Sequence, residues 1–188
     1  TVDPLLPTLD DDSVNVNEDT AKNIDVLGND AANSGVMDTE SVTIVGGSGP
    51  AHGSATPQAG GAIRYDPTTN YNGLDSFRYR ACNTAGLCAT AAVSIMVTSG
   101  NDRPTIQPID DLVMIEGSTA SVDVIIDDID SSNLTVTATS NNTTVIPNGN
   151  LIVSGTGNNR TLQITSADNQ IGLAVITVSV TDGELSAT

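Results

Sequence analysis

The sequence predicts an all-β chain that folds as two tandem β-sandwich domains. Apolar and polar residues alternate along much of its 188 residues, and no segment shows a sustained helical period. Clusters of Gly, Asn, Asp and Pro separate the alternating runs, and the second half of the chain repeats the first. Short strands at this spacing favour Greek-key sandwiches over one open sheet.

The expected strands are runs in which apolar residues take every second position, because such a run buries one face and exposes the other. They span residues 13–17, 76–81, 92–97, 121–126, 134–140 and 174–180. Turn-rich stretches lie between them, such as GGSGPAHG at 46–53 and NNTTVIPNGN at 141–150.

The domain cores must be built mainly from Val, Ile, Leu and Ala, because the chain has no Trp, one Phe and three Tyr. Such β-branched cores suit sheets. Phe77 and Tyr79 alternate with Arg78 and Arg80, so we expect the two aromatic rings to fill the first core.

An internal repeat sets the number of domains. EDTAKNIDV at 18–26 matches EGSTASVDV at 116–124 with an offset of 98 residues. NYNGLDSFRYRACN at 70–83 matches NQIGLAVITVSVTD at 169–182 with an offset of 99. Two homologous domains explain both matches.

The domain boundary is expected within SGNDRP at 99–104, which gives domain 1 residues 1–100 and domain 2 residues 101–188. Residues 1–9 would form a linker before domain 1. Domain 2 is expected to lack most of its last strand, through the limit of the sequence or, alternatively, because a neighbour donates that strand. The chain begins TVDP without Met, which indicates a piece of a longer protein.

Composition excludes several functions. The formal charge of −17, from 23 acidic and 6 basic residues, would repel nucleic acid and anionic lipid. No apolar run approaches the length of a membrane-spanning helix. Nineteen of the acids are Asp, the residue that on short turns favours hard cations such as Ca²⁺, although a solvated acidic surface is the alternative.

The two cysteines, Cys82 and Cys88, flank a short Asn/Gly turn between two strand-like runs. A disulfide across the hairpin is the natural interpretation, and it indicates an oxidising, extracellular compartment. Two buried free thiols in a cytosolic protein are the alternative. A zinc site is not expected, because the single histidine, His52, is distant in sequence.

No catalytic motif is present, so the chain is not expected to be an enzyme. His52 lies on a Gly-rich turn without a partner motif for a nucleophilic triad, and we expect it on the surface. The stretch 46–53 lacks the Lys-Ser/Thr of a phosphate-binding loop.

The motifs of the chain resemble those of a known family. In the first half these are DDSVNVNEDT, IDVLGND and IRYDPTTNYNGLDSFRYRA, and in the second NDRPTIQPIDD and RTLQITSADNQIGLAVITVSVTDGELSA. They are similar to the bacterial tandem Ig-like, cadherin-like repeats of large secreted surface proteins and adhesins. The resemblance implies a bacterial cell-surface or extracellular location. It also implies neighbouring repeat domains of the same chain as partners, and possible binding of a surface glycan or another cell-surface protein.

The resemblance also implies Ca²⁺ between the domains, since cadherins bind it there through side-chain oxygens. The residues that match the cadherin ligand pattern, with Asp75 the loosest match, are Glu18, Asp75, Asn101, Asp102, Asp128, Asp130 and Asp182. Arg103 stands where cadherins usually have a second linker Asn. Asn83 and Ala32 replace acids at the outer end of domain 1, which argues against an ion there.

The residues near the junction suit calcium on chemical grounds too. Asp127, Asp128 and Asp130 fall on the turn that leaves a strand, and Asp128 and Asp130 point the same way if the backbone stays extended. An Asx-rich turn that caps its own backbone is the alternative. Pro104 holds the linker extended, which suits a stiff connection.

We therefore expect a calcium-binding extracellular spacer or adhesion module of a large bacterial surface protein. The alternative is a carbohydrate-binding module attached to a polysaccharide-processing or biofilm protein. The scarcity of aromatic residues argues against that alternative, because sugar rings stack on Trp or Tyr.

Overall fold

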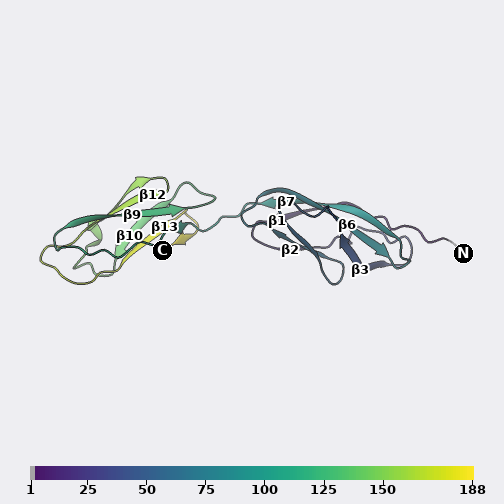
Figure 1. Ribbon diagram of the computed structural model, residues 1–188, viewed down its shortest axis with the longest axis horizontal. Coiled ribbons are helices and arrows are strands. Elements are labelled where there is room, and N and C mark those ends of the chain that lie inside the picture. The colour runs from purple at the N-terminus through teal and green to yellow at the C-terminus, as the bar shows by residue number, and fades with distance from the viewer. Residues whose placement is uncertain (1–2) are drawn as a thin grey trace. The chain divides into compact units, whose positions relative to one another are not determined.

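The computed structural model describes residues 3–188, and in them the chain forms two compact units that divide after Gly100. Figure 1 shows that each unit is built from strands. One 3₁₀ turn, Asn148–Asn150, is the only helical element among the described residues. The prediction of an all-β chain of tandem sandwiches is confirmed. No helix in residues 3–188 is long and apolar enough to cross a membrane.

Unit 1 contains a four-stranded and a three-stranded sheet. The larger sheet has the order β1 (Asp12–Asn17), β7 (Cys88–Thr98), β6 (Gly73–Asn83) and β3 (Met37–Ile44). The smaller has the order β2 (Lys22–Ile24), β5 (Ile63–Pro67) and β4 (Gly53–Pro57). β1 pairs with β7 in parallel, and the other pairs are antiparallel. The chain changes sheet between β1 and β2, β2 and β3, β3 and β4, and β5 and β6, so the sheets close around one core.

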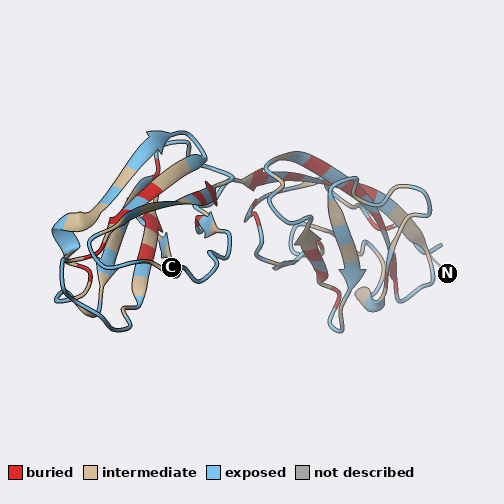
Figure 2. Cartoon of the chain, turned by 60° about the vertical axis from the view of Figure 1, so that its left-hand side comes forward, coloured by how far each residue is buried: buried red, intermediate tan, exposed pale blue. Residues whose placement is uncertain are grey.

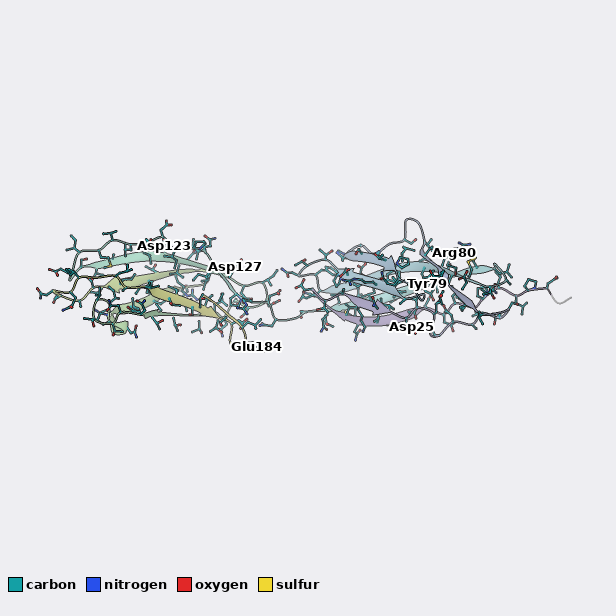
Figure 3. All side chains as sticks on the ribbon, turned by 90° about the horizontal axis from the view of Figure 1, so that it is seen from below. Asp25, Tyr79, Arg80, Asp123, Asp127 and Glu184 are labelled. Carbon is teal, nitrogen blue, oxygen red and sulfur yellow. A yellow bond between two sulfur atoms is a disulfide. The ribbon has the colours of Figure 1, made fainter. Side chains whose placement is uncertain are left out.

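The core of unit 1 follows the alternation of its long strands. Figure 2 shows buried and exposed residues taking turns along them. On β7, alternate residues from Ala91 to Val97 are each no more than 1% exposed. Phe77 and Tyr79 on β6 are buried as predicted, and Tyr79, labelled in Figure 3, donates hydrogen bonds from its hydroxyl to Val26 O (2.7 Å) and Asp30 Oδ2 (2.8 Å).

Unit 2 has a four-stranded sheet and a three-stranded sheet. The larger has the order β11 (Leu151–Thr156), β12 (Asn159–Thr165), β9 (Thr119–Asp127) and β8 (Thr105–Ile106). The smaller has the order β10 (Thr135–Ser140), β13 (Ile176–Thr181) and β14 (Ser186–Ala187). Its core contains Val124, Ile126, Leu162 and Val180, each no more than 1% exposed.

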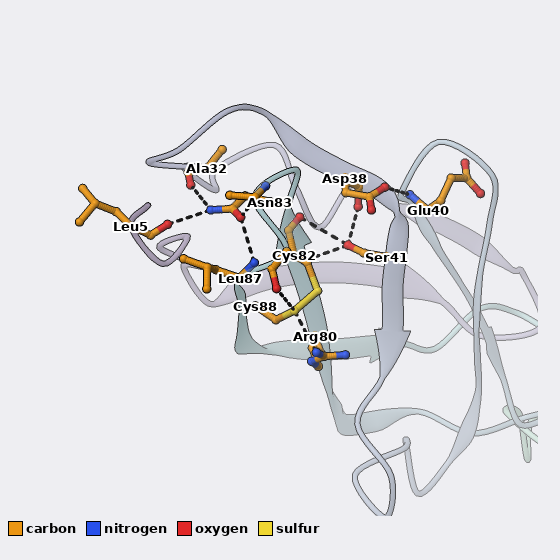
Figure 4. Close-up of a disulfide and its surroundings, with 12 residues drawn as sticks. Leu5, Ala32, Asp38, Glu40, Ser41, Arg80, Cys82, Asn83, Leu87 and Cys88 are labelled. Carbon is orange, nitrogen blue, oxygen red and sulfur yellow. Dashed lines mark hydrogen bonds between the residues drawn. A yellow bond between two sulfur atoms is a disulfide. The ribbon is translucent and has the colours of Figure 1, made fainter. Parts of the chain in front are cut away.

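The disulfide predicted between Cys82 and Cys88 is present. The two residues face each other at the end of the β6–β7 hairpin, where the ladder pairs them directly (Figure 4). The bond closes the turn that joins the two longest strands of unit 1.

Candidate metal centre

The turn after β9 holds one carboxylate with an unpartnered oxygen. The apolar alternation ends at Ile126, and the backbone then turns through Asp128. Oδ1 of Asp128 accepts hydrogen bonds from the N–H groups of Asp130 (2.9 Å) and Ser131 (2.8 Å). Oδ2 of Asp128 is buried and has no hydrogen-bond partner. An Asx turn therefore fixes this side chain, as the alternative interpretation expected, but uses only one of its two oxygens.

The linker residues lie beside this turn because of strand pairing within unit 2. β8 runs antiparallel to the end of β9, with Thr105 opposite Asp127, so residues just before β8 meet residues just after β9. The N–H of Asp102 donates to Oδ2 of Asp130 (2.7 Å). Carboxylate oxygens of Asp102 and Asp130 lie within 4.8 Å of each other, and such proximity of like charges favours a cation.

Asn101 contacts the last predicted ligand of unit 2. Its side-chain amide donates to Oδ2 of Asp182 (2.9 Å). Oδ1 of Asp182 accepts the N–H groups of Glu184 (2.6 Å) and Leu185 (2.7 Å), in the turn after β13; Glu184 is labelled in Figure 3. These backbone hydrogen bonds, that of Leu185 first, lower the pKa of Asp182, so the carboxylate is ionised at neutral pH.

Arg103 does not neutralise these carboxylates. Its guanidinium donates from Nη1 to the carbonyl oxygen of Ser186 (2.8 Å) on β14. Within residues 3–188 the ion pair found is between Arg64 and Asp66, on β5. The cation that replaces the second linker Asn of cadherins is thus engaged with a backbone carbonyl.

In unit 2, hydrogen bonds link Asp130 to Asp102 and to Asp128, and a separate hydrogen bond links Asn101 to Asp182. All are hard oxygen donors of the kind that Ca²⁺ prefers. The buried, unpartnered Oδ2 of Asp128 is the observation that fits a cation, because a buried carboxylate oxygen without a donor lacks compensation for its lost hydration.

Glu18 lies in unit 1, directly after β1. It is 6% exposed. Its N–H donates to Thr98 O (3.0 Å), and its Oε1 accepts the N–H of Gly100 (2.6 Å), the last residue of unit 1. Glu18 therefore fixes the residue that precedes the linker.

Asp75, the loosest of the ligand candidates, is engaged in hydrogen bonds within unit 1. The side chain is 8% exposed, and its two oxygens accept four hydrogen bonds, from the N–H groups of Ala51, His52 and Ser76 and the hydroxyl of Tyr65. Burial by itself would raise the pKa of Asp75, but the hydrogen bonds have the larger combined effect, so the pKa is lowered. We therefore leave Asp75 out of the proposed ligand set: it holds the 46–53 loop against β6.

The outer end of unit 1 has an amide side chain at the position that corresponds to Asp182. Asn83, the counterpart of Asp182, is 1% exposed. Its Oδ1 accepts N–H groups from Ala85 (3.2 Å) and Leu87 (3.1 Å), much as Oδ1 of Asp182 binds its own turn. Its Nδ2 donates to the carbonyls of Leu5 (2.8 Å) and Ala32 (2.9 Å), as Figure 4 shows. An amide donor thus stands where unit 2 has a carboxylate oxygen.

Asp12, on β1, is a titratable residue that the sequence did not single out. Its Oδ2 is buried without a hydrogen-bond partner. Burial first, and then the charge of Asp30, raise the pKa of Asp12 to about 6. The Asp10–Asp12 run is the one signal in the sequence, but a run of acids does not reveal which member the strand turns inward.

Known proteins share this fold. Solved structures of two protocadherin fragments cover 97% and 96% of the chain: gammaB7 domains EC3-6 (19% identity, TM-score 0.50, 46% of that chain) and Gamma B2 domains 3-6 (13% identity, TM-score 0.52, 45% of that chain). At these identities the likeness shows the fold alone.

One curated protein also matches. The Protein GAMETE EXPRESSED 2 of Arabidopsis thaliana is 36% identical over 91 residues, which is 48% of this chain and 9% of that protein. The chain thus spans a small part of that relative.

A family model matches the chain twice, and the two matches together cover nearly all of it. The model describes the Bacterial Ig domain, and it matches residues 4–96 and again residues 101–188. Domains of this family are generally extracellular, and their fold typically lacks enzymatic activity. The chain belongs to the bacterial Ig domain family, of which it carries two tandem copies.

Proposed function

We propose that the chain is a calcium-dependent spacer or adhesion module of an extracellular bacterial surface protein. Tandem Ig-like domains that resemble cadherins suggest an extracellular adhesion or spacer role. Calcium is the finer part of the proposal, and it depends on the carboxylates at the linker end of unit 2.

The observation that carries the proposal is the orphaned Oδ2 of Asp128. Asp128, Asp130, Asp102 and Asp182 would hold the ion, with the amide oxygen of Asn101 as a further ligand. When bound, Ca²⁺ supplies the positive charge that offsets the repulsion among these carboxylates. Extracellular calcium modules bind with dissociation constants of roughly 10⁻⁴ to 10⁻³ M, so occupancy would follow ambient calcium.

Stiffening would follow from how the ligands are distributed along the chain. Asn101 and Asp102 belong to the linker, and Pro104 already restricts its backbone. Glu18 holds Gly100, the last residue of unit 1, through a hydrogen bond of 2.6 Å, so the chain is already fixed where the linker begins. Calcium would then limit the bending of the linker.

Calorimetric titration with CaCl₂ and solution X-ray scattering with and without chelator test the proposal. We expect Asp128→Asn to weaken calcium binding about tenfold or more, because a charged ligand becomes neutral. The matched control is Asp123→Asn, on an exposed position of β9. Glu18→Gln should retain calcium binding at unit 2, because Glu18 belongs to unit 1.

Two results would contradict the proposal. One is equal calcium affinity in the original protein and in Asp128→Asn, which would show adsorption to the acidic surface. The other is a melting temperature and scattering profile that chelator leaves unchanged.

Carbohydrate binding gains no support from the aromatic residues. Phe77, Tyr65 and Tyr79 are buried, and Tyr71 is stacked on His52 with ring centroids 3.9 Å apart. The hydroxyl of Tyr71 also donates to Leu74 O (2.7 Å). These contacts leave no free pair of aromatic faces for a sugar.

A further inference from the structure

Strand β10 lies at the edge of the smaller sheet of unit 2, where β13 pairs with one side of it (both are labelled in Figure 1). The chain then passes through residues 141–150 to β11, which belongs to the other sheet. Within residues 3–188, no strand pairs with the outer side of β10. An edge of this kind can add a further strand.

Side chains cap both ends of this outer edge. At the end of β10, the N–H of Ser140 donates to Oδ1 of Asn148 (2.8 Å). Just before β10 begins, the carbonyl oxygen of Leu134 accepts a hydrogen bond from Nη2 of Arg160 (3.3 Å). The backbone groups of Ser140 and Leu134 therefore point away from β13.

The backbone between the two caps is open. N–H and C=O groups of successive residues point to opposite sides of a strand, so Val136 and Ala138 point the same way as Ser140. No residue of the described part of the chain forms a hydrogen bond with the outward N–H and C=O groups of Val136 and Ala138. These groups can therefore pair with another strand.

Unit 1 protects the same edge. Its strand β3 is the counterpart of β10 at the offset of 98 residues, and Asp38 and Glu40 stand where unit 2 has Val136 and Ala138. The register between β3 and β6 also shifts between Asp38 and Thr43. Charges and bulges are common means by which proteins prevent pairing between sheet edges. β10 has no charged residue, and its register with β13 is regular.

The surroundings of β10 are uncharged in a strongly acidic chain. Residues 131–159 contain no Asp, Glu, Lys or Arg, although the formal net charge is −17. Two copies of so acidic a chain repel each other over most of their surface. They meet the least repulsion at an uncharged edge, which favours a second copy of the chain as the occupant.

The sequence of β10 is also symmetric about Thr137. It reads TVTAT from Thr135 to Thr139, and the three Thr side chains are exposed. Antiparallel pairing of two copies about an axis at Thr137 would place Thr opposite Thr along the exposed face. On the inner face, Val136 would lie opposite Ala138, a larger side chain beside a smaller one. Cross-strand Thr pairs stabilise a sheet, and no like charges would meet.

We propose that unit 2 binds a second copy of the chain through β10, with the two strands antiparallel and Thr137 on a two-fold axis. Val136 of each copy would exchange both backbone hydrogen bonds with Ala138 of the other, so the two smaller sheets would become one. The contact is short, so the association is weak. It uses none of the proposed calcium ligands, and it is therefore independent of the calcium proposal.

Sedimentation equilibrium of the full 188-residue chain in chelator tests the proposal, because calcium then does not contribute. Concentrations from about 10 µM to about 1 mM cover the range expected for a small interface. We expect a reversible monomer–dimer equilibrium that strengthens at higher salt, since salt screens the repulsion between acidic chains. Hydrogen exchange at the highest concentration should show protection of the amides of Val136 and Ala138.

Thr137 provides a variant that leaves the core intact, because its side chain is exposed. Thr137→Asp should weaken dimerisation about tenfold or more, since two carboxylates would face each other on the axis. The matched control is Thr177→Asp, an exposed position on β13, one strand away from the edge. An equimolar mixture of Thr137→Asp and Thr137→Lys should recover dimerisation, because opposite charges then meet. Melting temperatures at low concentration should match that of the original protein.

Three results would overturn the proposal. The first is a chain that stays monomeric over the whole concentration range. The second is equal dimerisation of Thr137→Asp and Thr177→Asp, or a dimer that leaves the amides of Val136 and Ala138 unprotected, since the copies would then meet at another surface. The third is a mixture of the Asp and Lys variants that associates no better than either variant alone, because Thr137 would then not face its own copy.

Discussion

The side chain of Asn83 donates a hydrogen bond of 2.8 Å to the carbonyl oxygen of Leu5, and the equivalent residue in unit 2 is the carboxylate of Asp182. One atom decides the difference, because an amide nitrogen can satisfy carbonyl oxygens directly whereas a carboxylate oxygen needs a donor or a cation. The turn in unit 1 therefore binds two backbone carbonyl oxygens through an amide, whereas the turn in unit 2 presents a negative charge to the amide of Asn101.

We expect Asn83→Asp to destabilise unit 1 by about 2–4 kcal/mol, because a buried carboxylate would face two carbonyl oxygens. Chemical denaturation followed by Tyr fluorescence reports on unit 1, since all three Tyr lie there. Asn83→Ser, which also loses the two donated bonds but adds no charge, is the control. Equal stability of Asn83→Asp and the original protein would show that the amide is dispensable.

Asp12 should make unit 1 more stable at mildly acidic pH than at neutral pH. Its pKa is about 6 in the fold and 3.8 in the unfolded chain, so folding favours the protonated form. The penalty is absent below about pH 4, grows as pH rises from about 4 to about 6, and is constant above that, at about 1–2 kcal/mol after allowance for solvent screening. Burial also raises the pKa of Asp30, which adds in the same direction.

Asp12→Asn should remove this pH dependence and stabilise unit 1 at pH 7. Denaturation midpoints between pH 4 and 7.5 would measure it, with the exposed Asp11→Asn as the control. A parallel loss of stability in both proteins over this range would assign the effect to other carboxylates.

The sequence predicted the fold where one face of a strand is buried and one is exposed, as in β6, β7 and β9. It did not single out β5, although Ile63 and Tyr65 in it are fully buried, because a five-residue run that ends in Asp-Pro resembles a turn as much as a strand. The alternation of apolar and polar residues identifies a strand only when the run is long, as in the 11 residues of β6 and of β7, and not in the 5 residues of β5.

The candidate site was predictable only as a set of residue types. The repeat and the linker pattern located Asp128, Asp130 and Asp182 in the chain. They could not show that Asp128 keeps one oxygen unpartnered while all the oxygens of Asp75 are engaged, since that depends on which N–H groups the folded loops bring within reach. Hydrogen-bond partners are a tertiary property, and sequence spacing does not encode them.

Asp75→Asn should destabilise unit 1 by about 2–4 kcal/mol without changing calcium affinity. Both oxygens of Asp75 accept hydrogen bonds from N–H and O–H groups. In the Asn variant an NH₂ group replaces one of these oxygens, and its hydrogens would point at the N–H or O–H groups that the oxygen accepted. Because the pKa of Asp75 is lowered, its contribution is present above pH 3.8 and is lost as pH falls further. Calorimetric calcium titration of the folded variant separates the two roles: a large loss of affinity would restore Asp75 as a ligand.

Reduction of the Cys82–Cys88 disulfide should destabilise unit 1 and leave unit 2 unchanged. The bond closes a loop with a sequence separation of 6, for which the chain-entropy estimate is about 2 kcal/mol. The cysteines face each other at the hairpin end, so Cys82→Ser with Cys88→Ser should preserve the β6–β7 register and lower only the unfolding transition reported by Tyr fluorescence. Scanning calorimetry with and without reductant measures both units, and reductant should have no effect on the double variant. An equal shift of both transitions would show that the two units unfold as one.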